Sequence, residues 1–282
     1  MRARTLRLSC LALLLPLAGA CADEPAGAVA TSSLEQACVT PEPEPPLYPA
    51  GQTLFGKTPG EWTAAWWQWS LAIQKIGNPM RGGPCDQNQS GDVFFLAGNF
   101  GGVETRTCEI PSGKALYFPI INMICRAAPE ASCAATGDLA ELTACSRMGE
   151  HVQLSLTIDG VAIEGLTDYR ADSDIFNASV PAERAQHVMP CIGPIRANTC
   201  GVEVGSERPI MTDGYWVMVR PLAPGPHTLR FVGVDGLPPD AFSLDVTYNI
   251  NVTPEPEPEP TPEPTPAPEP TPEPAPEPAP AT

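Results

Sequence analysis

The first regular pattern of apolar positions in the chain is that of an α-helix. Large apolar side chains recur every three or four residues, at Trp62, Trp66, Trp69, Ile73 and Ile76. This period places them on one face of a helix. The preceding Thr58-Pro59-Gly60-Glu61 combines a capping box with proline at the first helical position. The sequence therefore predicts a helix that begins after Thr58 and ends near Gly77 and Pro79.

Beyond this helix the apolar period changes to two, which is typical of β-strands. Residues 93–97 and 115–121 are continuous apolar runs, as expected for strands buried on both faces. Residues 152–158 alternate between apolar and polar side chains, and Asp159-Gly160 then predicts a type I′ hairpin turn into residues 161–163. Later strands are predicted at residues 215–219, around 229–231, and at 242–252.

A mainly β fold follows from this series of short strands separated by Gly and Pro turns. Residues 138–148 predict a short second helix, capped by Asp138. We therefore expect residues 54–252 to form one domain, an antiparallel β-sandwich (immunoglobulin-like or jelly-roll-like) with an N-terminal Trp-rich helix and a short second helix. About 200 residues can bury a substantial core.

The N-terminal residues 1–20 have the pattern of a secretory signal peptide. Three arginines precede a short apolar run that ends in Ala18-Gly19-Ala20-Cys21. The run is too short to span a bilayer stably. The site resembles a bacterial lipobox, so the alternatives are lipidation of Cys21 and release as a soluble exported protein. We favour a lipoprotein of the bacterial cell envelope, whose partner is the lipid bilayer that holds acylated Cys21.

Proline-rich segments flank the predicted domain. Residues 21–53 include a short Pro-Glu stretch and are predicted to be a linker, and residues 253–282 place proline at nearly every second position. This composition cannot bury apolar surface and favours an extended, disordered chain. We interpret both segments as spacers.

The charge of the chain restricts its partners. Its 282 residues carry a formal net charge of −17. Nucleic acids are poor partners for such a chain, because they are bound by basic residues that neutralise phosphate. No motif predicts a cofactor, and the pattern does not indicate an oligomeric state.

Eight cysteines remain when Cys10 and Cys21 are set aside, and an even number in an exported chain indicates disulfides. Proximity in sequence favours three pairs, Cys85–Cys108, Cys125–Cys145 and Cys191–Cys200. Cys38 and Cys133 are then either paired with each other or free. Zinc binding is the alternative, but the chain has no C-x-x-C motif and its three histidines are far apart.

Several strings within residues 54–252 are unusual, namely EWTAAWWQW at 61–69, FLAG at 95–98, GKALYFP at 113–119 and DGYW at 213–216. Together they resemble an uncharacterised family of exported proteins from ammonia-oxidising archaea and some bacteria. The resemblance implies the domain boundaries and counterparts for Cys85, Cys108, Cys125 and Cys145, which agrees with two of the pairs above. It implies no activity.

Four of the five tryptophans lie between Trp62 and Trp69. The first interpretation is that their rings pack the helix against the sheet. The alternative is an aromatic platform for a sugar ring, formed by Trp66, Trp69 and above all Trp67, which points about 100° away from the others and would be the exposed member. Tyr169 and Arg170 complete the candidate ligand-binding residues.

The sequence contains few groups with recognisable chemistry. Asp168, Asp172 and Asp174 are weak calcium candidates, because their spacing matches no EF-hand loop and Arg170 is a ready partner for one of them. The motifs G-x-S-x-G, H-E-x-x-H and G-x-G-x-x-G are absent.

Two carboxylates, for instance Glu61 and Glu109, could still meet in space and hydrolyse a glycoside. His187 has no identifiable partner, and His227 follows a Pro-Gly-Pro turn, where we expect a structural hydrogen bond. We therefore expect a non-enzymatic binding module for a glycan or an envelope protein. The first alternative is a carbohydrate-active hydrolase with a carboxylate pair in a Trp-lined cleft, and the second is a structural envelope lipoprotein.

Overall fold

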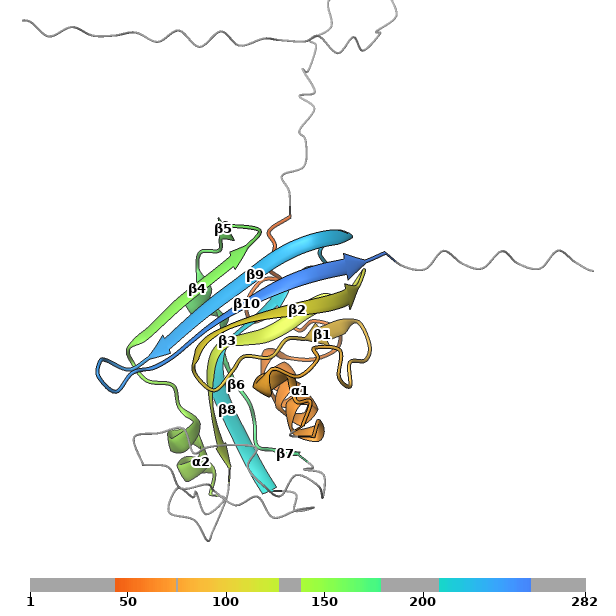
Figure 1. The fold of residues 1–282 in the computed structure, drawn as a ribbon. Helices are drawn as coiled ribbons and strands as arrows, with labels where there is room; N and C mark the ends of the chain where they lie inside the picture. Colours follow the sequence, from red (N-terminus) through yellow and green to blue (C-terminus); the bar gives the residue numbers. More distant parts are fainter. Residues whose placement is uncertain (1–43, 75, 127–137, 179–207, 255–282) are drawn as a thin grey trace, which may run out of the picture. The chain divides into compact units, whose positions relative to one another are not determined.

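The computed structural model of the chain describes residues 44–74, 76–126, 138–178 and 208–254. Within them the fold is mainly β, with ten strands in two five-stranded sheets, two α-helices and two 3₁₀-helices (Figure 1). The prediction of a mainly β domain with an N-terminal Trp-rich helix and a short second helix is confirmed. The predicted signal peptide, Cys21, and most of the predicted linker and tail lie outside the described residues.

The first sheet has the order β1-β3-β8-β6, and β7 also pairs with β8. Its strands are β1 (Val93–Phe95), β3 (Ala115–Arg126), β6 (Arg170–Asp172), β7 (Phe176–Ala178) and β8 (Arg208–Val219). The long strands β3 and β8 pair antiparallel along most of their length, which makes them the centre of this sheet.

The second sheet has the order β2-β10-β9-β4-β5. Its strands are β2 (Gly102–Pro111), β4 (Val152–Ile158), β5 (Val161–Ala162), β9 (Gly225–Asp235) and β10 (Phe242–Thr253). The predicted hairpin between β4 and β5 is present, and both of its turn residues, Asp159 and Gly160, have positive φ, as a type I′ turn requires.

Two strand pairs correct the expectation of purely antiparallel sheets. β1 runs parallel to β3, and β2 runs parallel to β10. The chain order explains the first pair, because β2 lies between β1 and β3 in sequence but belongs to the other sheet. The chain therefore leaves the first sheet and returns to it in the same direction, which is a crossover connection rather than a hairpin.

The two sheets share a buried apolar core. Phe118 of β3 and Phe231 of β9 face each other with ring centroids 4.9 Å apart. Val217 of the first sheet and Val246 of the second are completely buried in the same cluster. This core accounts for the strict alternation in β10, whose even-numbered apolar side chains point inward.

Helix α1 (Pro59–Ala72) covers the other face of the first sheet, where Trp66 and Trp216 of β8 contact each other with ring centroids 5.6 Å apart. The predicted capping box is present: the Thr58 backbone N–H donates to Glu61 at 2.7 Å, and the Glu61 N–H donates to the Thr58 hydroxyl at 3.3 Å. The helix thus begins where the sequence predicts.

The end of α1 differs from the prediction. The helix stops at Ala72, and Asn78 then donates through its side-chain amide to the carbonyls of Ser70 and Ile73. These bonds satisfy carbonyl groups that the helix leaves unpaired, so an early end costs little. Ile76, predicted on the buried face, is 92% exposed because it lies beyond the helix. A short 3₁₀-helix, η1 (Pro79–Arg81), follows.

Two disulfides connect elements of the described fold. Cys85–Cys108 ties the loop after η1 to β2, and Cys125–Cys145 ties β3 to α2 (Leu139–Ser146). These two of the three predicted pairs are confirmed. The predicted cap of α2 is also present, because the Asp138 carboxylate accepts from the Ala140 N–H. The pair Cys191–Cys200, together with Cys38 and Cys133, lies outside the described residues.

Residues 44–57, which we call the N-terminal strap, pack against the end of β8 although most of them were predicted to be linker. The Tyr48 N–H donates to the Met218 carbonyl at 2.9 Å. Arg220, just past the end of β8, completes the same bridge: its backbone N–H donates to the Pro46 carbonyl at 2.8 Å, and its guanidinium lies over the Tyr48 ring, 4.3 Å from the centroid. The strap therefore extends the edge of the first sheet.

Candidate functional site

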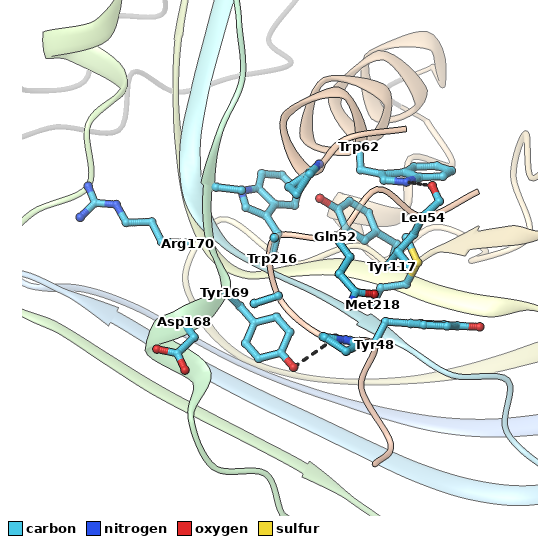
Figure 2. A pocket seen from close by; sticks show the side chains of 15 residues that line it. Tyr48, Gln52, Leu54, Trp62, Tyr117, Asp168, Tyr169, Arg170, Trp216 and Met218 are labelled. Carbon is cyan, nitrogen blue, oxygen red and sulfur yellow. Dashed lines mark hydrogen bonds between the residues drawn. The ribbon is translucent and has the colours of Figure 1, made fainter. Parts of the chain in front are cut away.

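A small hollow lies between the N-terminal strap, the first turn of α1 and the first sheet (Figure 2). Its volume is about 40 Å³. We call it the aromatic hollow, because five of its lining residues are the aromatic side chains Tyr48, Trp62, Tyr117, Tyr169 and Trp216. Ligand sites that enclose a whole small molecule are usually several times larger, so this hollow has room for one small group only.

The strap forms the outer wall of the aromatic hollow. Gly51 and Gly56 both have positive φ, which lets residues 48–57 fold back on themselves, and Leu54 pairs with Lys57. The Trp62 indole N–H donates to the Leu54 carbonyl at 2.8 Å, which fastens this wall to α1.

The opposite wall is formed by η2 (Leu166–Tyr169) and the start of β6. The Tyr169 hydroxyl donates to the Tyr48 carbonyl at 3.1 Å, drawn as a dashed line in Figure 2. This bond connects two segments that are more than a hundred positions apart in the sequence.

The floor of the hollow consists of two buried rings, Tyr117 from β3 and Trp216 from β8. The rings stack with centroids 5.8 Å apart and planes inclined by 11°. Each residue is only 4% exposed. The Tyr117 hydroxyl and the Trp216 indole nitrogen are buried, and neither has a hydrogen-bond partner among the described residues. Most buried polar groups are paired, so two unpaired groups beside one hollow need an explanation.

Burial also fixes the protonation state of the floor. Desolvation raises the pKa of Tyr117 well above its ordinary value, so the phenol stays neutral at any physiological pH. The unpaired groups are therefore one hydroxyl, which can donate and accept, and one indole N–H, which can only donate, and both are buried from solvent.

Charge at the hollow comes from two lining residues, Asp168 and Arg170. Arg170 is engaged elsewhere, since its Nε and Nη2 donate to the two carboxylate oxygens of Asp213 at 3.1 and 2.6 Å. This bidentate pair raises the pKa of Arg170 and offsets its charge. No described residue forms an ion pair with Asp168, and the cations of Lys57 and Arg220 lie over the Trp62 and Tyr48 rings, 5.6 and 4.3 Å from their centroids.

The three tryptophans predicted to form a platform are buried, which corrects the expectation that Trp67 is exposed. Trp67 is 3% exposed and donates through its indole nitrogen to the Thr212 hydroxyl at 3.1 Å. Trp66 donates to the Leu96 carbonyl and Trp69 to the Gln87 carbonyl. The helix is covered on two sides, by β8 as well as by the residues around β1, so its second face is also buried. The packing interpretation holds for all three.

Tyr169 and Arg170, the other two candidate ligand-binding residues, do line the aromatic hollow. The sequence did not identify their partners Tyr48, Gln52, Tyr117 and Trp216. The string DGYW was recognisable as unusual, but nothing in its spacing indicated that the Trp216 nitrogen has no partner.

The acids considered for calcium are not gathered into a metal site. Asp168 lies on the rim of the hollow, whereas Asp172 lies in β6 opposite Asp213. Across the described ranges, no group of three His, Cys, Asp or Glu residues has an arrangement that could hold a metal ion. Arg170 was expected to pair with one of these acids and pairs with Asp213 instead.

The two glutamates considered for catalysis serve separate structural roles. Glu61 accepts from Thr58 in the capping box, and hydrogen bonds from the Thr58 backbone and then from its side chain lower the Glu61 pKa. Glu109 accepts from the Asn251 side-chain amide at 2.7 Å. Neither residue lines the aromatic hollow, and in the described part of the chain Asp168 is the one carboxylate that does.

His227 makes structural hydrogen bonds of the kind expected for it. One ring nitrogen lies 2.8 Å from the Asp159 carboxylate and the other 2.7 Å from the Ala223 carbonyl. Because both neighbours are acceptors, the imidazolium form fits this position, with both nitrogens donating. His187 lies outside the described residues.

No family model, curated protein or solved structure matches the chain. The resemblance seen in the sequence therefore stays a prediction, and the functional argument depends on the geometry of the site. Neither helix of the described ranges has the length and apolar run that a membrane crossing needs.

Proposed function

We propose that the chain is an exported binding module of the bacterial cell envelope, anchored through acylated Cys21, and that it binds a glycan at the aromatic hollow. One observation carries this proposal: the hollow has a stacked Tyr–Trp floor, and the exposed polar side chains of Gln52 and Asp168 line it together with aromatic rings. Aromatic faces next to polar side chains suit a sugar, which has apolar C–H faces and hydroxyl groups.

Two features support the extracytoplasmic location. Residues 1–21 have the pattern of a signal peptide that ends in a cysteine. Two disulfides occur in the described fold, and such bonds persist mainly in oxidising compartments.

The geometry favours binding over the two alternatives. A glycoside hydrolase needs two carboxyl groups about 5 to 10 Å apart across the scissile bond. Among the described residues Asp168 is the single carboxylate in the lining, so they do not supply that pair. A purely structural envelope protein would not need a concave site lined by aromatic rings and polar side chains.

The test is retention of the full mature chain, residues 21–282, on a panel of immobilised polysaccharides. The variants Gln52→Ala and Asp168→Asn change exposed residues of the hollow, and Asp240→Asn in the turn between β9 and β10 is a matched surface control. We expect at least one polysaccharide to retain the wild type and the control but to retain both rim variants more weakly.

Three other outcomes would contradict the proposal in different ways. Retention that the rim variants leave unchanged would place binding on another surface. Release of soluble sugar products would support the hydrolase alternative. Failure of every polysaccharide to retain the chain would exclude a glycan among those in the panel and favour a protein partner.

A further inference from the structure

We infer that Phe55, at the tip of the N-terminal strap, is a sugar-stacking residue, whose ring binds the apolar face of a pyranose that lies outside the aromatic hollow. This residue belongs to the glycan site of the proposed function, on which the inference rests, and it extends that site beyond the hollow. Three features of Phe55 point to this role, namely its backbone conformation, the exposure of its ring and its position beside the hollow.

Phe55 has a backbone conformation that is unfavourable for a phenylalanine. Leu54 and Lys57 exchange both of their backbone hydrogen bonds, at 2.9 and 3.0 Å. The two residues between them, Phe55 and Gly56, have φ values of 49° and 77°. Positive φ at both central positions is typical of a type I′ turn, which favours Asn, Asp or Gly at the first of them. A bulky side chain is strained there, because its Cβ lies too close to a backbone carbonyl oxygen.

The other residues of this kind in the described ranges show the usual choice of side chain. The β4–β5 turn has nearly the same geometry, with φ values of 51° at Asp159 and 79° at Gly160. Among the described residues, three that are not glycine have positive φ, and besides Phe55 they are Asp159 and Asn88, both of types that tolerate this region. A phenylalanine that strains its own turn needs a role that compensates for the cost.

Burial in the core does not supply that role. Phe55 is 45% exposed, whereas the aromatic rings that line the hollow are buried or half-buried. Among the described residues, Tyr48 is the one aromatic residue that contacts Phe55, with ring centroids 5.8 Å apart and planes inclined by 83°. A single perpendicular ring covers at most one face of Phe55, which leaves the exposed part of its ring for a ligand.

Phe55 lies next to the aromatic hollow but does not line it. Its sequence neighbour Leu54 and its ring contact Tyr48 both line the hollow. A volume of about 40 Å³ admits one small group of a sugar, so the rest of the sugar must lie on the surface around the hollow. Phe55 provides an exposed aromatic ring on that surface, and the C–H groups of a pyranose pack against such a ring.

The surroundings of Phe55 favour a sugar over a protein partner. The exposed residues of the strap near it in sequence are polar or glycine, namely Gln52, Thr53, Gly56 and Lys57. A standard protein interface buries roughly 800 Å² on each partner, around an apolar centre, and a single ring does not offer that. One pyranose is about as large as one phenyl ring, and its hydroxyl groups can form hydrogen bonds with polar side chains beside Phe55.

The first experiment separates the role of the ring from its cost to the fold. Phe55→Asn removes the ring and introduces a residue that type I′ turns favour, so we expect a melting temperature that is unchanged or raised by up to about 4 °C. Phe55→Tyr keeps both the ring and the strain and should melt like the wild type. A lower melting temperature for Phe55→Asn would show that the ring serves stability, and the inference would be wrong.

The second experiment compares retention of the full mature chain, residues 21–282, on immobilised cellulose, chitin, starch, xylan and mannan. On a polysaccharide that retains the wild type, we expect Phe55→Asn to bind about tenfold more weakly and Phe55→Tyr to bind like the wild type. Leu237→Asn is the matched control, because it removes an apolar side chain that is 58% exposed from the turn between β9 and β10. This control should also bind like the wild type.

The outcomes distinguish this inference from the proposed function. If Phe55→Asn is retained like the wild type while Gln52→Ala and Asp168→Asn are retained more weakly, the inference is wrong and the proposed function holds. Loss of binding by Phe55→Tyr, or an equal loss by Leu237→Asn, would also contradict a specific role of the Phe55 ring. Absence of wild-type retention on every polysaccharide would overturn both.

Discussion

Trp67 is fixed by contacts on two sides of its ring. Its ring and that of Trp66 are nearly perpendicular with centroids 5.0 Å apart, and its nitrogen donates to the Thr212 hydroxyl of β8. Thr212 in turn donates to the Met123 carbonyl at 2.7 Å, so the bond continues into the centre of the first sheet. A residue placed in this way contributes to stability rather than to recognition.

Replacement of Trp67 by alanine should therefore destabilise the fold. A buried aromatic side chain reduced to a methyl group leaves a cavity and typically lowers the free energy of unfolding by about 3–5 kcal/mol. Chemical denaturation measures this change. Leu237→Ala, at an exposed position, is the control and should change stability by less than about 0.5 kcal/mol. A similarly small effect at Trp67 would mean that the ring is free.

His227 joins the start of β9 to the β4–β5 turn through Asp159. Burial alone would lower the His227 pKa, but the hydrogen bonds to Asp159 and Ala223 outweigh it and raise that pKa above the ordinary 6.5. For Asp159, burial alone would raise the pKa, but hydrogen bonds from His227 and the Thr228 N–H lower it below 3.8. Each group thus favours the charged form of the other.

The stabilisation from this pair should depend on pH. The His227 contribution is complete below pH 6.5 and is lost as the pH rises through the raised pKa. The Asp159 contribution is present above pH 3.8 and is lost as the pH falls through the lowered pKa. We expect His227→Gln to lower the melting temperature more at pH 5.5 than at pH 8.5. His151→Gln, which changes an exposed ring, should show no such difference, and a pH-independent effect at His227 would contradict the assignment.

Helix α1 illustrates how local rules determine one end of an element better than the other. Its start depends on neighbours within four residues, which the sequence displays directly. Its end depends on Asn78, which reaches back to the Ser70 and Ile73 carbonyls across a turn. That contact exists only once the turn has formed, so the sequence does not display it. The prediction relied on the period of apolar residues alone and therefore extended the helix too far, to Ile76.

Loss of the cap at the start of α1 should have a measurable cost. Thr58→Ala removes the hydroxyl that accepts from the Glu61 N–H, and such caps contribute about 1 kcal/mol. Thr53→Ala, an exposed threonine of the strap, is the matched control and should be nearly neutral. Urea denaturation of the two variants gives the comparison, and equal stabilities would show that the capping box contributes little here.

The sequence predicted the strands that have one buried face, and it missed a strand whose two faces are similarly polar. The strands β4 and β10 alternate clearly because one side of each faces the shared core. Strand β2 was not predicted: it lies at the edge of the second sheet, and Val103 near its start is 81% exposed. In the first half of β2 both faces carry polar residues, so the sequence has no alternation of apolar and polar positions there.

The two sheets approach each other closely at a glycine of β9. A Cβ atom on Gly233 of β9 would lie 2.5 Å from the Ile121 Cβ and 2.8 Å from the Ile120 carbonyl oxygen of β3. Neither atom is the flexible end of a side chain, so the facing strand would have to move. Gly233 thus sets the spacing between the sheets at this point.

Gly233→Ala should therefore destabilise the whole domain. Overpacking of a well-filled core costs about 1–3 kcal/mol. Gly98→Ala is the control, because its added methyl would meet only the Leu244 side chain at 3.9 Å, an ordinary contact. Thermal unfolding of both variants tests this, and a neutral Gly233→Ala would mean that the sheets can separate slightly without loss.

The aromatic hollow could not be predicted from the sequence for a reason that concerns the whole molecule. Its lining comes from the strap, α1, η2, β3, β6 and β8, which meet only after the first sheet has formed. Sequence patterns indicated α1, β3 and β8 separately but did not indicate β6. They gave no sign that residues 44–53 pack on β8, because that segment is rich in proline and reads as a linker.

The contacts between Arg220 and the strap have a consequence for how the molecule responds to force. Arg220 contacts Glu44, Pro45 and Pro46 as well as the ring of Tyr48, which is also a wall of the aromatic hollow. In a molecule tethered through Cys21, a pulling force along the tether would reach these contacts before any other part of the described fold. A tension that detaches the strap from β8 would also open the hollow. A sugar bound there would therefore be released when the tether is under tension.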